Sequence, residues 1–128
     1  MMKNSLLVLT LALSLGAQSI GNPSSFSSIA QTALNIKPNA GAGEIVGWNF
    51  TNTGNATCYI QFFNATAANV SVGSTVPYFA IPIQTTNVNL FMTGFRIPFS
   101  VGMSIASATT ATGNTGCNAN PAGVVFYH

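Results

Sequence analysis

The sequence predicts an all-β protein, a sandwich or barrel built from about eight short antiparallel strands. Threonine and aromatic residues, which favour strands, and asparagine and glycine, which favour turns, dominate its composition. Charged residues make up only 3% of the chain, so the strong helix formers Glu, Lys and Arg are nearly absent. Short apolar segments recur roughly every ten residues between turn signals, which is the spacing expected of such a fold.

The first half of the domain contains the clearest strand patterns. A first strand is predicted over residues 33–37, ended by the turn at 38–41, and a second over 44–51. Residues 52–55 (NTGN) are typical of a hairpin turn, because asparagine and glycine tolerate positive φ. In the third strand, over 56–64, Cys58, Ile60 and Phe62 alternate with Tyr59, Gln61 and Phe63. Residues 22–28 (NPSSFSS) are interpreted as a polar linker.

The second half is predicted from shorter signals. Pro77 and Pro82 restrict the segment between them to a sheet edge or a bulge, because proline cannot donate a ladder hydrogen bond. A long loop over 113–123 holds Cys117. The expected strands are residues 70–72, 78–83, 87–91, 96–99, 103–110 and 124–128.

The few charged residues exclude several classes of function. They are Lys3, Lys37, Arg96 and Glu44, with His128 as the only histidine and no aspartate. Hydrolysis by paired carboxylates needs two acids, and a Ser-His-Asp triad needs an acid and a placed histidine. Three cations do not form a nucleic-acid-binding patch, and the available zinc ligands have no close spacing. We therefore expect a non-enzymatic structural or interaction protein without a cofactor.

The first twenty residues have two interpretations. Lys3, the apolar run 6–15 and the small residues Ala17 and Ser19 match a secretory signal peptide. The run is too short to cross a membrane as a helix, which needs about 20 residues. The second interpretation is an uncleaved β arm, because large and smaller residues alternate strictly from 7 to 15. Its large residues, the candidates for contact with a neighbour, are Leu7, Leu9, Leu11, Leu13 and Leu15.

Three segments together resemble a small β-sandwich domain of tailed-phage and prophage virion proteins. They are ALNIKPNAGAGEIVGWNFTNTGNATCYIQFFNA (33–65), VSVGSTVPYFAIPI (70–83) and FRIPFSVGMSIASATTATG (95–113). The resemblance covers about residues 33–128 and implies a jelly-roll-like sandwich, which we assign to residues 31–128. The arm or signal-like segment and linker over residues 1–30 is an extension that many members of the family lack.

The same resemblance implies a role on the particle surface as a capsid decoration (cement) protein or a related head or tail ornament. The expected partners are the major capsid protein or another virion protein and further copies in a homo-trimer, with no nucleic acid and no membrane. The alternative is a secreted or periplasmic β-sandwich binding module with a cleaved signal peptide, in which carbohydrate is a possible ligand.

Three groups of residues have both a functional and a structural interpretation. Cys58 and Cys117 form a disulfide if the strand of Cys58 and the last strand are neighbours; otherwise they are two buried thiols. Glu44 forms a salt bridge either between subunits or with Lys37 or Arg96 at the surface. The aromatic side chains form a sugar-binding platform or, as their alternation favours, part of the core; they are Trp48, Tyr59, Phe62 and Phe63.

Overall fold

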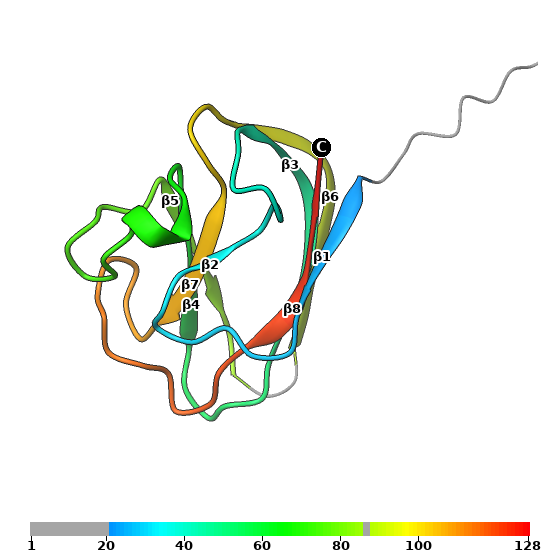
Figure 1. The fold of residues 1–128 in the computed structure, drawn as a ribbon. Coiled ribbons are helices and arrows are strands. Elements are labelled where there is room, and N and C mark those ends of the chain that lie inside the picture. The colour runs from blue at the N-terminus through cyan, green and yellow to red at the C-terminus, as the bar shows by residue number, and fades with distance from the viewer. Residues whose placement is uncertain (1–20, 86–87) are drawn as a thin grey trace, which may run out of the picture.

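Eight β strands in two sheets make up the described part of the chain (Figure 1). The computed structural model describes residues 21–85 and 88–128. Its strands are β1 (Asn22–Phe26), β2 (Leu34–Asn35), β3 (Gly43–Asn52), β4 (Cys58–Phe63), β5 (Phe79–Ile83), β6 (Val88–Phe99), β7 (Ser104–Ala108) and β8 (Ala122–Tyr127). The single helix among these residues is the short 3-10 turn η1 (Ala67–Asn69). The all-β prediction is confirmed.

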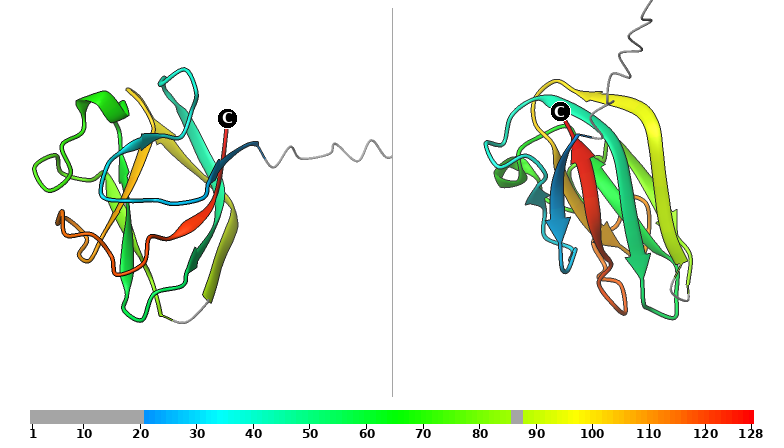
Figure 2. Two further views of the ribbon diagram at one scale, coloured as in Figure 1. Left: turned by 60° about the horizontal axis from the view of Figure 1, so that its bottom comes forward. Right: turned by 90° about the vertical axis from the view of Figure 1, so that its right-hand side faces the viewer.

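The strand pairing is that of a jelly roll. The first sheet has the order β1-β8-β3-β6 and the second β2-β7-β4-β5, and every pair is antiparallel. The pairs β4-β5, β3-β6, β2-β7 and β1-β8 are nested, as in one long hairpin. Rolling that hairpin up brings β8 against β3 and β7 against β4, which separates the strands into two packed sheets (Figure 2). The predicted jelly-roll-like antiparallel sandwich is therefore the observed fold.

The core lies between the inner faces of the two sheets. Phe50 of β3 and Phe62 of β4 are fully buried, and the indole ring of Trp48 lies 4.6 Å from the ring of Phe95 and 5.4 Å from that of Phe62, between centroids. Each large apolar side chain buried in this way stabilises the fold by about 1.5–3 kcal/mol. The period-2 alternation of β3 and β4 is what places these rings on one side of their sheets.

Three local predictions were wrong. The turn at residues 52–55 does not close a hairpin, because the two strands that it joins, β3 and β4, lie in different sheets. Residues 22–28, interpreted as a linker, contain β1, which pairs with β8 from Asn22 opposite Tyr127 to Phe26 opposite Gly123. Pro23 is compatible with this strand because β1 is a sheet edge, where one side needs no donor. Of the predicted strand 70–72, only a bridge between Val72 and Thr75 is present.

The strands predicted over 87–91 and 96–99 form one continuous strand, β6. Residues 92–95, which lie between the two predicted strands, coincide with an irregularity in the pairing of β6 with β3. The register of that pairing shifts between Ile45 and Gly47. Gly94 adopts φ 85° there, a conformation that glycine tolerates readily. A bulge thus bends the strand without ending it.

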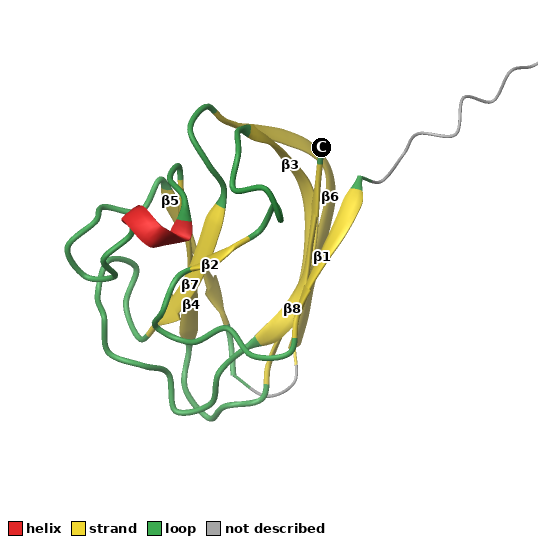
Figure 3. Cartoon of the chain, viewed as in Figure 1, coloured by secondary structure: helices red, strands yellow, loops and turns green. Residues whose placement is uncertain are grey.

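The two sheets differ in what covers their outer faces. On the second sheet, Gln61 and Phe63 point away from the core yet are 0% and 1% exposed. The amide nitrogen of Gln61 donates to the carbonyls of Thr110 and Gly113, at 3.1 and 3.0 Å, in the loop after β7. That loop and the loop between β4 and β5 lie over the second sheet, whereas no described loop covers the outer face of the first (Figure 3).

Asn52, the last residue of β3, joins three segments at one end of the sandwich. Its buried amide nitrogen donates to the carbonyls of Ala56 and Ile83, at 2.9 and 3.1 Å, and its side-chain oxygen accepts from the backbone of Gly54. We expect Asn52→Ala to lower the free energy of unfolding by about 2–3 kcal/mol, because these groups lose their partner inside the protein.

Chemical denaturation measures this effect. Asn39→Ala, at an exposed loop position, is the matched control and is expected to change stability by less than about 0.5 kcal/mol. Equal losses in the two variants would show that the Asn52 hydrogen bonds contribute nothing specific.

Candidate functional site

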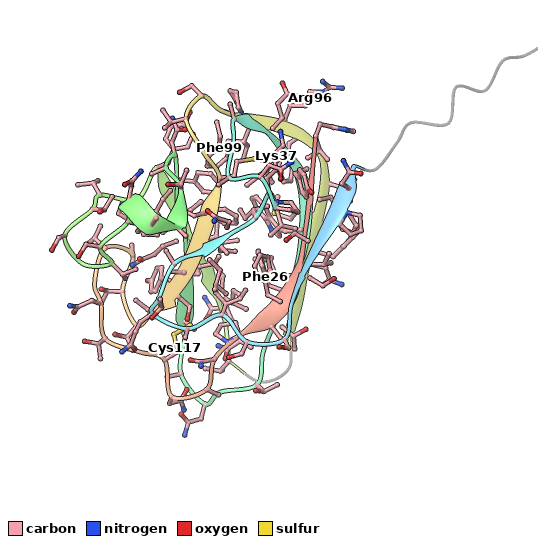
Figure 4. All side chains as sticks on the ribbon, viewed as in Figure 1. Phe26, Lys37, Arg96, Phe99 and Cys117 are labelled. Carbon is pink, nitrogen blue, oxygen red and sulfur yellow. A yellow bond between two sulfur atoms is a disulfide. The ribbon has the colours of Figure 1, made fainter. Side chains whose placement is uncertain are left out.

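The charged side chains of the described residues gather at one end of the sandwich. Lys37, Glu44 and Arg96 all lie near the end where β1 begins and β8 ends (Figure 4). Arg96 Nη1 lies 3.0 Å from Glu44 Oε2, and the two side chains are 72% and 37% exposed. Lys37 instead donates to the carbonyl of Ala42 at 2.9 Å. The predicted partner of Glu44 within the chain is thus Arg96, and such an exposed pair is worth at most about 1 kcal/mol.

The two cysteines form a disulfide at the opposite end of the sandwich. Cys58 begins β4, Cys117 lies in the loop between β7 and β8, and their Cα atoms are 5.8 Å apart. The predicted disulfide is present. It does not join neighbouring strands, because β4 and β8 belong to different sheets; Cys117 instead meets Cys58 from the loop that precedes β8. The amide of Asn118 donates to the side-chain oxygen of Asn55 beside it. The disulfide therefore attaches the long loop to the turn that precedes β4.

The aromatic residues considered as a sugar platform do not form one. Trp48 is 4% exposed, Phe62 0% and Phe63 1%, and only Tyr59 of the four is partly accessible. Trp48 and Phe62 pack in the core, while Phe63 lies under the loops that cover the second sheet. The interpretation of these rings as core, which their alternation favoured, is confirmed for Trp48 and Phe62.

The described residues contain neither a cluster of metal ligands nor a membrane-spanning helix. Within 21–85 and 88–128, no three His, Cys, Asp or Glu side chains come close enough to hold a metal ion. No helix of this part of the chain has the length and apolar character needed to cross a membrane.

Besides Leu34 of β2, which is 38% exposed, large apolar side chains are exposed in two places that the sequence patterns did not indicate. Val76, Tyr78 and Val101 lie in loops at the charged end, where the ring of Tyr78 packs edge-on against Phe99, 5.3 Å between centroids. Phe91 and Met92 lie in β6 and are 59% and 46% exposed. The signal for the second group was the run Leu90-Phe91-Met92, because three large apolar residues in a row put at least one on each face of a strand.

The four sheet edges differ in how they are protected against pairing with another strand. Proteins commonly protect edges with proline, charge, a bulge or short length. β1 carries Pro23, β5 carries Pro82 as predicted for an edge, and β2 has only two residues. The second half of β6 carries Gly94, Arg96 and Pro98, but its first half, residues 88–93, has none of these features. The free edge at 88–93, with Phe91 and Met92 exposed on it, is the candidate interaction site.

Comparisons with known proteins add no information about the function of this chain. The chain matches no protein-family model, no curated protein and no solved structure. The structure shows the fold that the resemblance implied, a small two-sheet antiparallel β sandwich, and no match identifies virion proteins. The predicted arm contacts, Leu7, Leu9, Leu11, Leu13 and Leu15, lie outside the described residues.

Proposed function

We propose that this protein is a non-enzymatic structural protein of a phage virion, a capsid decoration protein that binds and stabilises the particle surface. The observation that carries the proposal is a jelly-roll sandwich with only three charged side chains, all at one end, among the described residues. A surface of Ser, Thr and Asn solvates the fold while offering little charge repulsion against packing in an assembly. The jelly roll is also a recurrent architecture of capsid proteins, although a fold alone does not determine a function.

In this proposal the sandwich is a rigid module and residues 1–20 attach it to a neighbour. The major capsid protein or another virion protein is the partner on the particle, and the copies are arranged as a trimer. An extended segment binds a sheet edge through backbone hydrogen bonds and gains specificity from alternate side chains. Five leucine side chains, at about 1.5–3 kcal/mol each when buried, provide ample affinity for such attachment.

We expect deletion of residues 1–20 to abolish binding to particles assembled without the protein, measured by co-sedimentation against the full chain. The shortened chain retains the eight strands that the structure describes and the disulfide, so its circular dichroism and unfolding midpoint are expected to stay close to those of the full chain. Normal decoration by the shortened chain would reject the arm as the attachment element. Failure of the full chain to bind particles would reject the virion function itself.

The disulfide and the leucine-rich N-terminus favour a second candidate, a secreted or periplasmic β-sandwich binding module. Disulfides persist mainly in oxidising compartments, which include the periplasm. The mass of the intact protein purified from its natural source separates the two functions. A mass that matches Met1–His128 supports the retained arm, whereas a chain that begins near Ile20 supports secretion. A carbohydrate ligand would need a site other than the aromatic residues already considered, since Trp48 and Phe62 are in the core.

A further inference from the structure

The side of the sandwich next to the free edge of β6 is incompletely closed. Strands β5 and β6 are the edge strands on this side of the two sheets, and at the charged end the rings of Phe79 and Phe99 lie 6.2 Å apart, between centroids. Five apolar side chains of these two strands pack on the core yet are only partly buried; they are Phe79, Ile81, Leu90, Phe95 and Ile97. Met92 lies opposite Trp48 in the β3-β6 register, so it continues this inner row at 46% exposure. The row forms an apolar seam between the two edge strands.

A strand added to β6 would complete this seam. Its backbone would pair with the free side of residues 88–93, which form the outer margin of the first sheet (Figure 2, right). Its side chains would alternate between the inner row, beside Leu90 and Met92, and the outer face, beside Phe91. The fitting strand is thus uncharged, with large apolar residues on one face and smaller residues on the other.

Residues 7–15 of this chain have that pattern. Leucine occupies every odd position from Leu7 to Leu15, and the even positions are Val8, Thr10, Ala12 and Ser14. The leucines match the apolar seam, and the smaller side chains leave room for Phe91 on the outer face. No charged residue lies between Lys3 and Lys37, so pairing of this segment buries no charge.

The arm of the same chain does not reach this position in an antiparallel arrangement. Gly21 precedes β1, and the register places Asn22 level with Tyr127, Ile45 and Ile97. Across the sheet, the added strand lies four strand spacings, or about 19 Å, from β1. Along the sheet, the Leu15 end of the added strand lies beside Val88, which is about 30 Å from the level of Ile97 and Asn22. The six residue steps from Leu15 to Gly21 span at most about 22 Å, whereas the diagonal is about 35 Å.

We propose that residues 7–15 of a second copy of this chain add as an antiparallel strand to β6 at residues 88–93. Each copy then offers one arm and one edge, so the contact is head-to-tail and closes into a ring if the rotation permits. Both halves of the contact belong to this chain, so self-association does not depend on the proposed role in a virion.

Light scattering coupled to size-exclusion chromatography, without particles, tests the proposal on the full chain. We expect the full chain to form an oligomer and the chain without residues 1–20 to be a monomer. Met92→Lys places a charge on the seam and is expected to give a monomer with the arm still attached. Val101→Lys is the matched control, 62% exposed in a loop at the other end, and is expected to leave the oligomer intact. Phe91→Lys replaces Met92→Lys if that variant fails to fold.

Amide hydrogen exchange identifies the strand to which the arm binds. In the oligomer, backbone amides within 88–93 are expected to exchange at least about tenfold more slowly than in the chain without residues 1–20. The proposal would be overturned by a full chain that is monomeric or by an oligomer that survives removal of residues 1–20. It would also be overturned by an oligomer that withstands Met92→Lys or, where that variant fails to fold, Phe91→Lys. A monomer with protected 88–93 amides would assign the edge to the chain's own arm instead. Oligomerisation without particle binding would reject only the virion function.

Discussion

Phe62→Ala is expected to lower the free energy of unfolding by about 3–5 kcal/mol, measured by guanidinium denaturation. Phe62 is fully buried in β4, and its ring stacks on that of Phe79 in β5 at 4.5 Å between centroids. The ring also lies 5.4 Å from that of Trp48 and 6.2 Å from that of Phe50, both in the opposite sheet. Removing it leaves a cavity between the sheets, and the rigid strands on both sides limit how far the site can collapse.

Val101→Ala is the control, because it shortens an apolar side chain that is 62% exposed in a loop, away from the core and from residues 88–93. Its effect on stability is expected to stay within about 0.5 kcal/mol. A domain of this size is typically stable by about 5–15 kcal/mol, so the two variants are readily separated by their midpoints. Comparable losses at the two positions would contradict the assignment of Phe62 to the core.

Reduction of the Cys58–Cys117 disulfide is expected to lower the free energy of unfolding by about 4 kcal/mol. The two cysteines are 59 residues apart in the sequence, and the crosslink restricts the unfolded chain by closing that long loop. The folded state changes less, because β4 remains paired with β5 and β7. Denaturation of one preparation with and without reductant measures the difference.

The double variant Cys58→Ala/Cys117→Ala provides the control for this measurement. Its midpoint is expected to lie near that of the reduced protein and to be insensitive to reductant. Two free thiols detected in the native, unreduced protein would show that the pair is not formed. An unchanged midpoint after verified reduction would show that the crosslink does not constrain the unfolded chain.

Local patterns were sufficient to predict the strands whose side chains alternate. Within residues 56–64, the apolar residues at 58, 60 and 62 alternate with the mixed apolar and polar residues at 59, 61 and 63, and β4 lies within that range. Pro82 indicated an edge strand, and β5 is the edge of its sheet. These predictions succeeded because the period of a strand and the missing donor of proline are properties of the local chain.

Predictions from local patterns were wrong where contacts between distant segments decide the structure. Residues 22–26 contain three polar residues and a proline and form a strand only because β8 supplies an edge for them. Gln61 is polar, yet it is fully buried because a loop about 50 residues later covers it and accepts its hydrogen bonds. Alternation favoured the core for Trp48 and Phe62, but the burial of Phe63 on the outer face of β4 follows only from the loops that cover this sheet.

By itself, the sequence determined that the protein is all-β and that it lacks the acids and bases of common catalytic sites. These follow from composition and from the two-residue period, which are local. Only the tertiary structure decided which strands are edges, which outer face is covered, and that residues 88–93 lack protection beside an open apolar seam. Those properties depend on how the chain rolls into two sheets, because burial and edge position arise from contacts between segments far apart in the sequence.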